Sequence, residues 1–244
     1  MKINFNNNIK GDKFFVNKVV VFIVEGGTDK RALENIFKKI YKYKQIHFEF
    51  THGDITSDEN INKSNIEIEI YKHVNSYLKD KKLKLTDIWQ IVQIFDTDGT
   101  YIEDSCVVQG TSEQFIYSTK SISCKNVQRV INRNRHKKEM IDYLLTCDKI
   151  KGIQYCCYYL SSNLDHALYN KLNLDDEEKI KYADKFYEQF IGKEKAFIDY
   201  LNMEVVNGVP ESFPLFWRYI KKGLHSLERH TNLNIYFKEN PILQ

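Results

Sequence analysis

The sequence predicts an α/β protein with a mostly parallel sheet flanked by helices and a helical C-terminal appendage. In its first hundred residues, strand-like and helix-like patterns alternate in the order β-α-β-α-β, which calls for right-handed crossovers and favours a parallel sheet. Two of the strands, over 19–24 and 91–95, are continuous hydrophobic runs, which is typical of strands covered on both faces. Beyond about residue 164, helical patterns dominate. We therefore expect an α/β domain over 1–170 and a mostly helical appendage over 171–244, packed on the core.

The first part of the chain alternates regularly between strand and helix. A strand over 18–24 precedes a helix over 28–41, whose apolar residues recur at helical spacing and whose start can be capped by Thr28 or Asp29. A strand over 45–51 alternates apolar and polar residues, which indicates one less buried face. The elements that follow are a loop over 53–64, a helix over 65–82 and a strand over 88–95.

The rest of the chain has a less regular pattern. No period is visible over 99–125, so we expect a loop or an irregular insertion beside the ends of the strands. The remaining predicted elements are a helix over 126–146, a fourth strand over 152–160, a turn over 161–163 and then mostly helix, with a strand pattern at 232–237 and a break at Pro210 and Pro214. The aromatic segment over 213–219 is typical of a buried helix face or an oligomer contact, and base stacking is the alternative.

Composition limits the classes of function. The 244 residues, 42% of them hydrophobic, suffice for a full core. The 36 basic and 33 acidic residues leave a net charge of +3, which is too balanced to require a nucleic-acid partner. No apolar run reaches the roughly 18 residues that span a bilayer, and residues 1–10 lack a signal-peptide pattern, so we expect a cytoplasmic protein without a membrane partner. The five cysteines show no zinc spacing, which favours free thiols.

Two acidic motifs end two of the predicted strands. Glu25 follows the strand over 19–24, and Asp96 and Asp98 follow the strand over 91–95. Because the carboxyl ends of parallel strands open onto one crevice, we expect these three carboxylates to meet. Aspartates two residues apart on an extended strand project to the same side, and a hard divalent cation such as Mg²⁺ relieves their repulsion. Glu25 is suited to acid-base chemistry or to a second metal ion. The alternative is that Glu25 and Asp96 end their strands as solvated turn residues, with Gly26, Gly27 and Gly99 supplying positive φ.

The run Val24-Glu25-Gly26 after a hydrophobic strand, with Asp96-Thr97-Asp98 ending a later strand, resembles the Toprim domain shared by topoisomerases, primases, OLD-family nucleases and small ribonucleases. The resemblance covers about residues 18–170 and implies a four-stranded parallel sheet flanked by helices. It also implies that the glutamate acts in acid-base chemistry and that the two aspartates hold Mg²⁺ for phosphodiester cleavage or transfer. Gly99 directly after the aspartates departs from the family pattern, in which a glycine often lies further on. The chain shows no active-site tyrosine motif and no zinc module, which argues against a topoisomerase and a primase.

A second resemblance lies after the fourth strand. The segment Ser162-Asn163-Leu164-Asp165 is similar to one in standalone Toprim-like proteins of the RloB and OLD-like kind, which are associated with bacterial defence. It implies that Asp165 is a further metal ligand, with His166 close by. The alternative is that Ser162 and Asp165, three residues apart, form a capping box for the next helix.

Basic residues lie in two places near these motifs. We expect five of them to bind nucleic acid, namely Arg129, Arg133, Lys137, Lys30 and Arg31. The first three share a face of the helix over 126–146, which is suited to neutralising backbone phosphates. The last two start the helix that follows Glu25, where a phosphate near the site would meet them. The alternative for the first three is a solvated helix surface balanced by Glu139 and Asp142.

Together these patterns predict a metal-dependent nuclease that cleaves phosphodiester bonds of DNA or RNA with Mg²⁺ or Mn²⁺, in phage defence or a related transaction. Nucleic acid is then its partner, while an activating protein partner and homo-oligomer formation stay open. One alternative is a non-catalytic Toprim-like regulatory or effector subunit that works through a protein partner. Another is a phosphatase or nucleotide hydrolase that uses the same acids on a small substrate.

Overall fold

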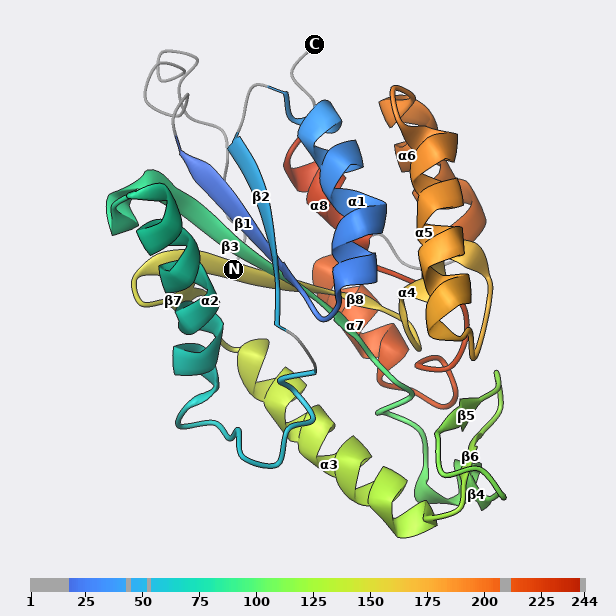
Figure 1. The fold of residues 1–244 in the computed structure, drawn as a ribbon. Helices are drawn as coiled ribbons and strands as arrows, with labels where there is room; N and C mark the ends of the chain where they lie inside the picture. The colour runs from blue at the N-terminus through green and yellow to red at the C-terminus, as the bar shows by residue number, and fades with distance from the viewer. Residues whose placement is uncertain (1–17, 43–44, 52–53, 207–211, 242–244) are drawn as a thin grey trace.

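A computed structural model of the chain describes residues 18–42, 45–51, 54–206 and 212–241. It contains a five-stranded sheet with the strand order β2-β1-β3-β8-β7 and a separate three-stranded sheet with the order β4-β6-β5 (Figure 1). The strands are β1 (Val19–Val24), β2 (Gln45–Phe50), β3 (Ile88–Asp96), β4 (Val107–Gln109), β5 (Ile116–Tyr117), β6 (Ile122–Cys124), β7 (Lys149–Ile150) and β8 (Ile153–Leu160). The helices are α1 (Gly27–Ile40), α2 (Ile66–Lys81), η2 (Leu85–Asp87), η3 (Asp104–Cys106), α3 (Val127–Leu144), α4 (Leu164–Tyr169), α5 (Asp176–Phe190), α6 (Glu194–Tyr200), η4 (Leu201–Val205), α7 (Phe213–Ile220) and α8 (Leu233–Glu239). The predicted α/β class is confirmed. Residues 1–17, Gly53 and Pro210, which entered the predictions, lie outside the described residues.

Four strands of the large sheet run parallel. Strand β1 lies between β2 and β3, and β8 pairs with the other side of β3. The two-residue strand β7 pairs antiparallel with the start of β8. Every residue of β1 is buried, because helices cover both faces, as its continuous hydrophobic run predicted. The carboxyl ends of β1, β2, β3 and β8 therefore lie at the same end of the sheet.

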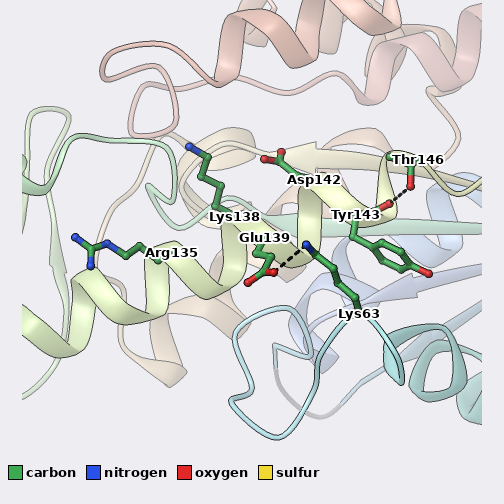
Figure 2. Close-up of a pocket in the computed structure, with 7 residues that line it drawn as sticks. All are labelled: Lys63, Arg135, Lys138, Glu139, Asp142, Tyr143 and Thr146. Atoms are coloured by element: carbon green, nitrogen blue, oxygen red, sulfur yellow. Dashed lines mark hydrogen bonds and ion pairs between the residues drawn. The ribbon is translucent and has the colours of Figure 1, made fainter.

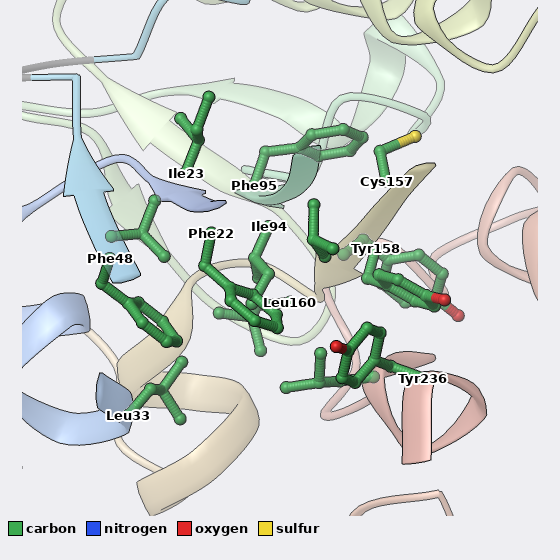
Figure 3. Packing of buried hydrophobic residues seen from close by; sticks show 14 of the residues in the cluster. Phe22, Ile23, Leu33, Phe48, Ile94, Phe95, Cys157, Tyr158, Leu160 and Tyr236 are labelled. Atoms are coloured by element: carbon green, nitrogen blue, oxygen red, sulfur yellow. The ribbon is translucent and has the colours of Figure 1, made fainter. Parts of the chain in front are cut away.

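Helices cover the two faces of this sheet. In Figure 1, α1 lies on one side together with α5, α6 and α8, and α2 and α3 lie on the other. Between sheet and helices, Phe22 of β1 has its ring centroid 4.9 Å from that of Phe37 on α1 and 5.2 Å from that of Tyr236 on α8. Figure 3 shows Phe22, Phe48 and Tyr236 in this packing. Residues of α5, α6, α7 and α8 belong to the same hydrophobic cluster as the sheet, so the chain beyond residue 170 shares its core.

The last part of the chain covers the edge of the sheet beyond β8. Because neighbouring residues of a strand point to opposite faces, Tyr158 and Tyr159 leave β8 on opposite sides. Their ring centroids lie 5.9 Å from Phe213 and 4.9 Å from Trp217, respectively, so α7 lies across this edge. The buried helix face predicted for the aromatic segment is confirmed for the inner residues of α7. In addition, the hydroxyl of Thr231 donates to the carbonyl of Tyr159 at 2.6 Å. This hydrogen bond occupies part of the free edge of β8, which could otherwise pair with another chain.

The segment after β3, predicted as a loop or irregular insertion, is a small sheet. Strands β4 and β6 pair in parallel, and β5 and β6 pair antiparallel. They enclose a second hydrophobic cluster that includes Ile122, Val130 of α3 and Leu227. Strands of two or three residues are too short to show a period, so the sequence pattern did not predict them. Gly99 begins the insertion with φ at +68°, and a Cβ there would lie 2.6 Å from Cδ2 of Leu227, so glycine is required by conformation and by space.

The strand predicted over 232–237 is wrong, because these residues belong to α8 and its N-cap. Leu233, Ile235 and Phe237 alternate with other residues at the period of a strand. However, all five residues from Leu233 to Phe237 are buried. A short helix that is buried on every side has no polar face, so its sequence carries no helical period.

Two predictions from composition can be compared with the described residues. None of the helices in the described ranges combines the length and apolar character needed to cross a membrane. The five cysteines are unpaired, in agreement with the predicted free thiols.

Candidate functional site

Three carboxylates meet at the carboxyl ends of the parallel strands. Glu25 directly follows β1, Asp98 lies just beyond the end of β3, and Asp54 lies just beyond the end of β2. One carboxylate oxygen of each lies within 4.8 Å of those of the other two. We call these residues the acidic trio. Their oxygens are close enough to share one divalent cation, so the trio is a candidate metal centre.

The ammonium group of Lys137 lies among the three carboxylates. Its Nζ is 2.5 Å from Oδ2 of Asp98, 2.6 Å from Oδ2 of Asp54 and 3.5 Å from Oε1 of Glu25. The side chain of Lys137 is 0% exposed. Burial by itself would lower the pKa of Lys137, but the three carboxylates outweigh it and raise the pKa well above its usual value. Lys137 therefore stays charged. Its ammonium group holds the three carboxylates together and lies between them, where a shared metal ion would also lie.

Asp54 is kept ionised by hydrogen bonds as well as by Lys137. The backbone N–H of Thr56 donates to its Oδ1 at 2.8 Å, and the hydroxyls of Thr56 and Ser57 donate to its two oxygens, each at 2.5 Å. Burial opposes ionisation, but Lys137 and these donors outweigh it and lower the pKa of Asp54 to about 2. Sequence analysis placed Asp54 in a loop and did not propose it as a ligand. The sequence nevertheless contains a signal for Asp54, because this residue lies just after β2, a strand that runs parallel to β1.

Asp98 is held in a strained backbone conformation. Its φ is +49°, and Ser162, which follows β8, has φ at +60°. The N–H of Asp98 donates to the carbonyl of Ser162 at 2.7 Å, and the N–H of Ser162 donates to Oγ1 of Thr97 at 2.9 Å. Left-handed non-glycine residues persist only where their surroundings hold them, and such residues cluster at functional sites. This turn also ends the strand alternation that would project Asp96 and Asp98 to the same side.

Asp96 lies beside the trio but is not part of it. Its backbone N–H donates to Oε1 of Glu25 at 3.1 Å. Burial raises the pKa of both Glu25 and Asp96 well above the usual range, and the neighbouring carboxylates raise it further. Both carboxyls therefore bind a proton more readily than exposed carboxyls do. The role of Asp96 as a metal ligand stays a prediction, because Asp54 is the third member of the cluster that the structure brings together.

Asp165, the further ligand that the sequence predicted, lies outside the trio and near Asp29. Burial raises the pKa of Asp165 to about 6, and burial with the charge of Asp165 raises that of Asp29 to about 7. The capping box considered for Ser162 and Asp165 is not formed. Asn163 caps α4 instead, since its side-chain oxygen accepts the N–H of His166 at 2.9 Å. The left-handed backbone of Ser162 is the physical reason, because a capping residue normally has an extended backbone.

Two of the five predicted nucleic-acid-binding residues reach the acids. Lys137 lies within the trio, and Arg133 donates to the backbone carbonyl of Asp98 at 3.0 Å. Arg129, one helical turn earlier, is exposed, and its guanidinium lies 5.1 Å from the centroid of the Phe115 ring. The face that these residues share thus runs from the surface of α3 into the site.

The other basic residues have partners elsewhere. Arg31 forms an ion pair with Asp184 of α5, and its Nη2 lies 2.7 Å from Oδ2 of that residue. Lys30 lies beside it in the first turn of α1. The acids expected to balance the α3 surface pair instead with lysines from other segments, since Glu139 lies 2.8 Å from Lys63 and Asp142 lies 2.6 Å from Lys221.

A shallow hollow of about 470 Å³ lies against the outer face of α3. Its lining, drawn in Figure 2, consists of Lys63, Arg135, Lys138, Glu139, Asp142, Tyr143 and Thr146. Charged groups of both signs face it, and the pair between Lys63 and Glu139 crosses it. None of the lining residues belongs to the acidic trio, so the hollow is separate from the candidate metal centre.

The sequence contained one signal for Lys137 that helical spacing makes visible. The buried face of α3 includes Val130, Met140, Ile141 and Leu144, and Lys137 lies on the same face. A lysine among apolar positions needs a buried partner of opposite charge, which here is the trio.

Comparisons with protein-family models, with curated proteins and with solved structures found no match for this chain.

Proposed function

We propose that this chain is a metal-dependent nuclease with a Toprim-like domain, which cleaves phosphodiester bonds of DNA or RNA in phage defence. The observation that carries the proposal is the acidic trio, with carboxylate oxygens within 4.8 Å of one another. Four parallel strands, with acids directly after the first and third in chain order, support the resemblance to Toprim domains. The defence role rests on the resemblance to standalone Toprim-like proteins.

The donor set fits Mg²⁺ or Mn²⁺. The trio offers only carboxylate oxygens, which hard divalent cations prefer, and Mg²⁺ commonly binds one or two carboxylates while keeping several waters. A positive charge already stabilises the trio, since the Lys137 ammonium lies within 3.5 Å of all three residues. When bound, such an ion lowers the pKa of a coordinated water and stabilises charge on the phosphate.

The side chains of the chain itself have distinct roles in this proposal. Asp54 and Asp98 would hold the ion, and Glu25 would either complete its ligands or move a proton, which its raised pKa permits. Lys137 holds the three carboxylates together through its ion pairs. Its positive charge would also add to the electrostatic stabilisation of a phosphate bound next to the trio.

The test is cleavage of plasmid, single-stranded DNA and total tRNA by the purified chain with Mg²⁺, Mn²⁺ or EDTA. We expect metal-dependent cleavage in the wild type and its loss in Asp98→Asn, which removes one charge from the trio. Asp104→Asn is the matched control, because Asp104 is an exposed aspartate that pairs with Arg135 at the surface. Equal cleavage by Asp98→Asn and Asp104→Asn would contradict the proposal.

A second candidate is a non-catalytic Toprim-like subunit that works through a protein partner. The observation in its favour is again Lys137, because an ammonium group that satisfies all three acids makes a metal unnecessary for folding. This candidate predicts that Mn²⁺ does not bind to the trio and that the chain is recovered with a partner protein. Direct Mn²⁺ binding that Asp98→Asn removes would exclude it.

A further inference from the structure

The guanidinium group of Arg133 reaches the edge of the acidic trio without being fully paired. Its Nη2 donates to the carbonyl of Asp98 at 3.0 Å, and its Nη1 lies 3.3 Å from the hydroxyl of Tyr117 and 3.4 Å from Oδ2 of Asp98. Its Nε is buried and has no hydrogen-bond partner among the described residues. Buried donors without a partner are rare in folded proteins, and this one leaves the guanidinium with an unused donor.

Tyr117 brings a second polar group to the same place from the small sheet. Its hydroxyl donates to Oδ1 of Asp98 at 3.3 Å and accepts from Nη1 of Arg133 at 3.3 Å. Both distances are longer than the roughly 2.7–3.0 Å of well-formed hydrogen bonds. The hydroxyl of Tyr117 is therefore only weakly held by its protein partners.

The backbone of Tyr117, by contrast, is held firmly. Its N–H donates to Oδ1 of Asn173 at 2.8 Å, and its carbonyl accepts from Nδ2 of Asn173 at 2.8 Å. The ring of Phe115, two residues earlier, lies under the guanidinium of Arg133 at 5.1 Å and orients it. The strong contacts thus fix the positions of Tyr117 and Arg133, while the Tyr117 hydroxyl and Nη1 of Arg133 make only contacts of 3.3–3.4 Å.

We propose that the Tyr117 hydroxyl and the Arg133 guanidinium form an anion subsite that binds a non-bridging oxygen of a phosphate next to the acidic trio. The phosphodiester as its natural ligand rests on the proposed function, whereas the subsite itself requires only a phosphate group. With the three acids ionised and a divalent ion bound, the trio, Lys137, Arg133 and the ion would together carry one positive charge, which a phosphodiester monoanion would neutralise. Without the ion, the carboxylate of Asp98 repels the phosphate, so binding is metal-assisted.

The test is calorimetric titration of inorganic phosphate into the full chain, with and without Mg²⁺. Phosphate should bind more tightly with Mg²⁺, and Arg133→Gln should weaken it by about tenfold, as expected for one charge-assisted hydrogen bond. Tyr117→Phe, which keeps the ring, should weaken it by about threefold. Arg135→Gln is the control, because Arg135 is on the same helix but is exposed and pairs with Asp104 at the surface.

Phosphate binding that is equal in Arg133→Gln and Arg135→Gln, or absent in the wild type, would overturn the subsite. The thermal midpoint of each variant shows whether it is folded. If Arg133→Gln is unstable, the weaker phosphate binding expected for Tyr117→Phe still tests the subsite. Failure of the proposed function has a different signature. If phosphate binds as expected while no polynucleotide is cleaved, the subsite stands and the chain is not a nuclease.

Discussion

The buried ammonium of Lys137 gives the sharpest prediction about stability. In Lys137→Met the aliphatic stem remains, but the trio loses the cation that lies within 3.5 Å of each acid. The lysine side chain is 0% exposed and those of the acids are 17% to 18% exposed, so water screens this loss only weakly. Removing one partner from a buried ion pair costs about 3–5 kcal/mol. For a chain of this size, that loss lowers the thermal midpoint by about 10 °C.

The assay is thermal and urea unfolding in EDTA and in Mg²⁺ or Mn²⁺. The metal should restore much of the lost stability, because an ion at about a hundred times its dissociation constant contributes about 2.7 kcal/mol. It should also stabilise Lys137→Met more than the wild type, since no ammonium competes for the trio. The control is Lys138→Met, the neighbouring residue, which is exposed. If Lys137→Met and Lys138→Met unfold at the same midpoint in EDTA, the proposed electrostatic role of Lys137 is wrong.

Two further predictions concern Asp54 and Gly99. The pKa of Asp54 is lowered from 3.8 to about 2, so the ionised carboxylate stabilises the fold by about 2 kcal/mol above about pH 4. This stabilisation disappears as the pH falls toward 2. In urea titrations, Asp54→Asn should therefore be less stable than the wild type at pH 6 but nearly equal to it at pH 2. An equal difference at both pH values would contradict this linkage. Gly99→Ala combines a φ of +68° with a Cβ placed 2.6 Å from a side-chain atom of Leu227, so it should destabilise the fold by about 2–4 kcal/mol. The control is Gly152→Ala, which has a φ of +82° but open space around the Cβ and should cost only about 1–2 kcal/mol. Equal urea midpoints for the two alanine variants would show that the close approach to Leu227 is relieved at no cost.

The parallel strands and two members of the site were predictable because their signals are local. A continuous apolar run followed at once by Glu25, and another followed by Asp96 and Asp98, needs no knowledge of distant residues. Parallel pairing then brings these strand ends together. The same reasoning gave α1, α2 and α3, whose apolar residues recur at helical spacing over long stretches.

The rest of the site depends on contacts between distant segments. Asp54 reaches the trio only after the chain continues past β2, and the loop composition around it hid this role. Lys137 was predicted to face a phosphate, but it lies among the buried apolar residues of α3 and contacts the trio instead. Asp96 and Asp98 were expected to project together, but the positive φ of Asp98 ends the strand alternation there. No local pattern encodes that turn, because it is held by a hydrogen bond to Ser162 after β8.

The small sheet between β3 and α3 shows the same limit. Its strands have two or three residues each, and their pairing is stabilised by contacts with α3 and Leu227 rather than by a period in the sequence. Yet this insertion supplies Tyr117 to the site, in keeping with the common location of functional residues on segments between regular elements.

The most direct test of the central claim is a calorimetric titration of Mn²⁺ into the wild type and into Asp54→Asn. Asp54 is the member of the trio that the fold, and not the sequence pattern, brought to the site. The proposal predicts saturable binding by the wild type and a loss of at least about tenfold in affinity in the variant, as for removal of one ligand. Mn²⁺ binding of the same strength in both proteins, or in neither, would contradict a metal centre formed by Glu25, Asp54 and Asp98.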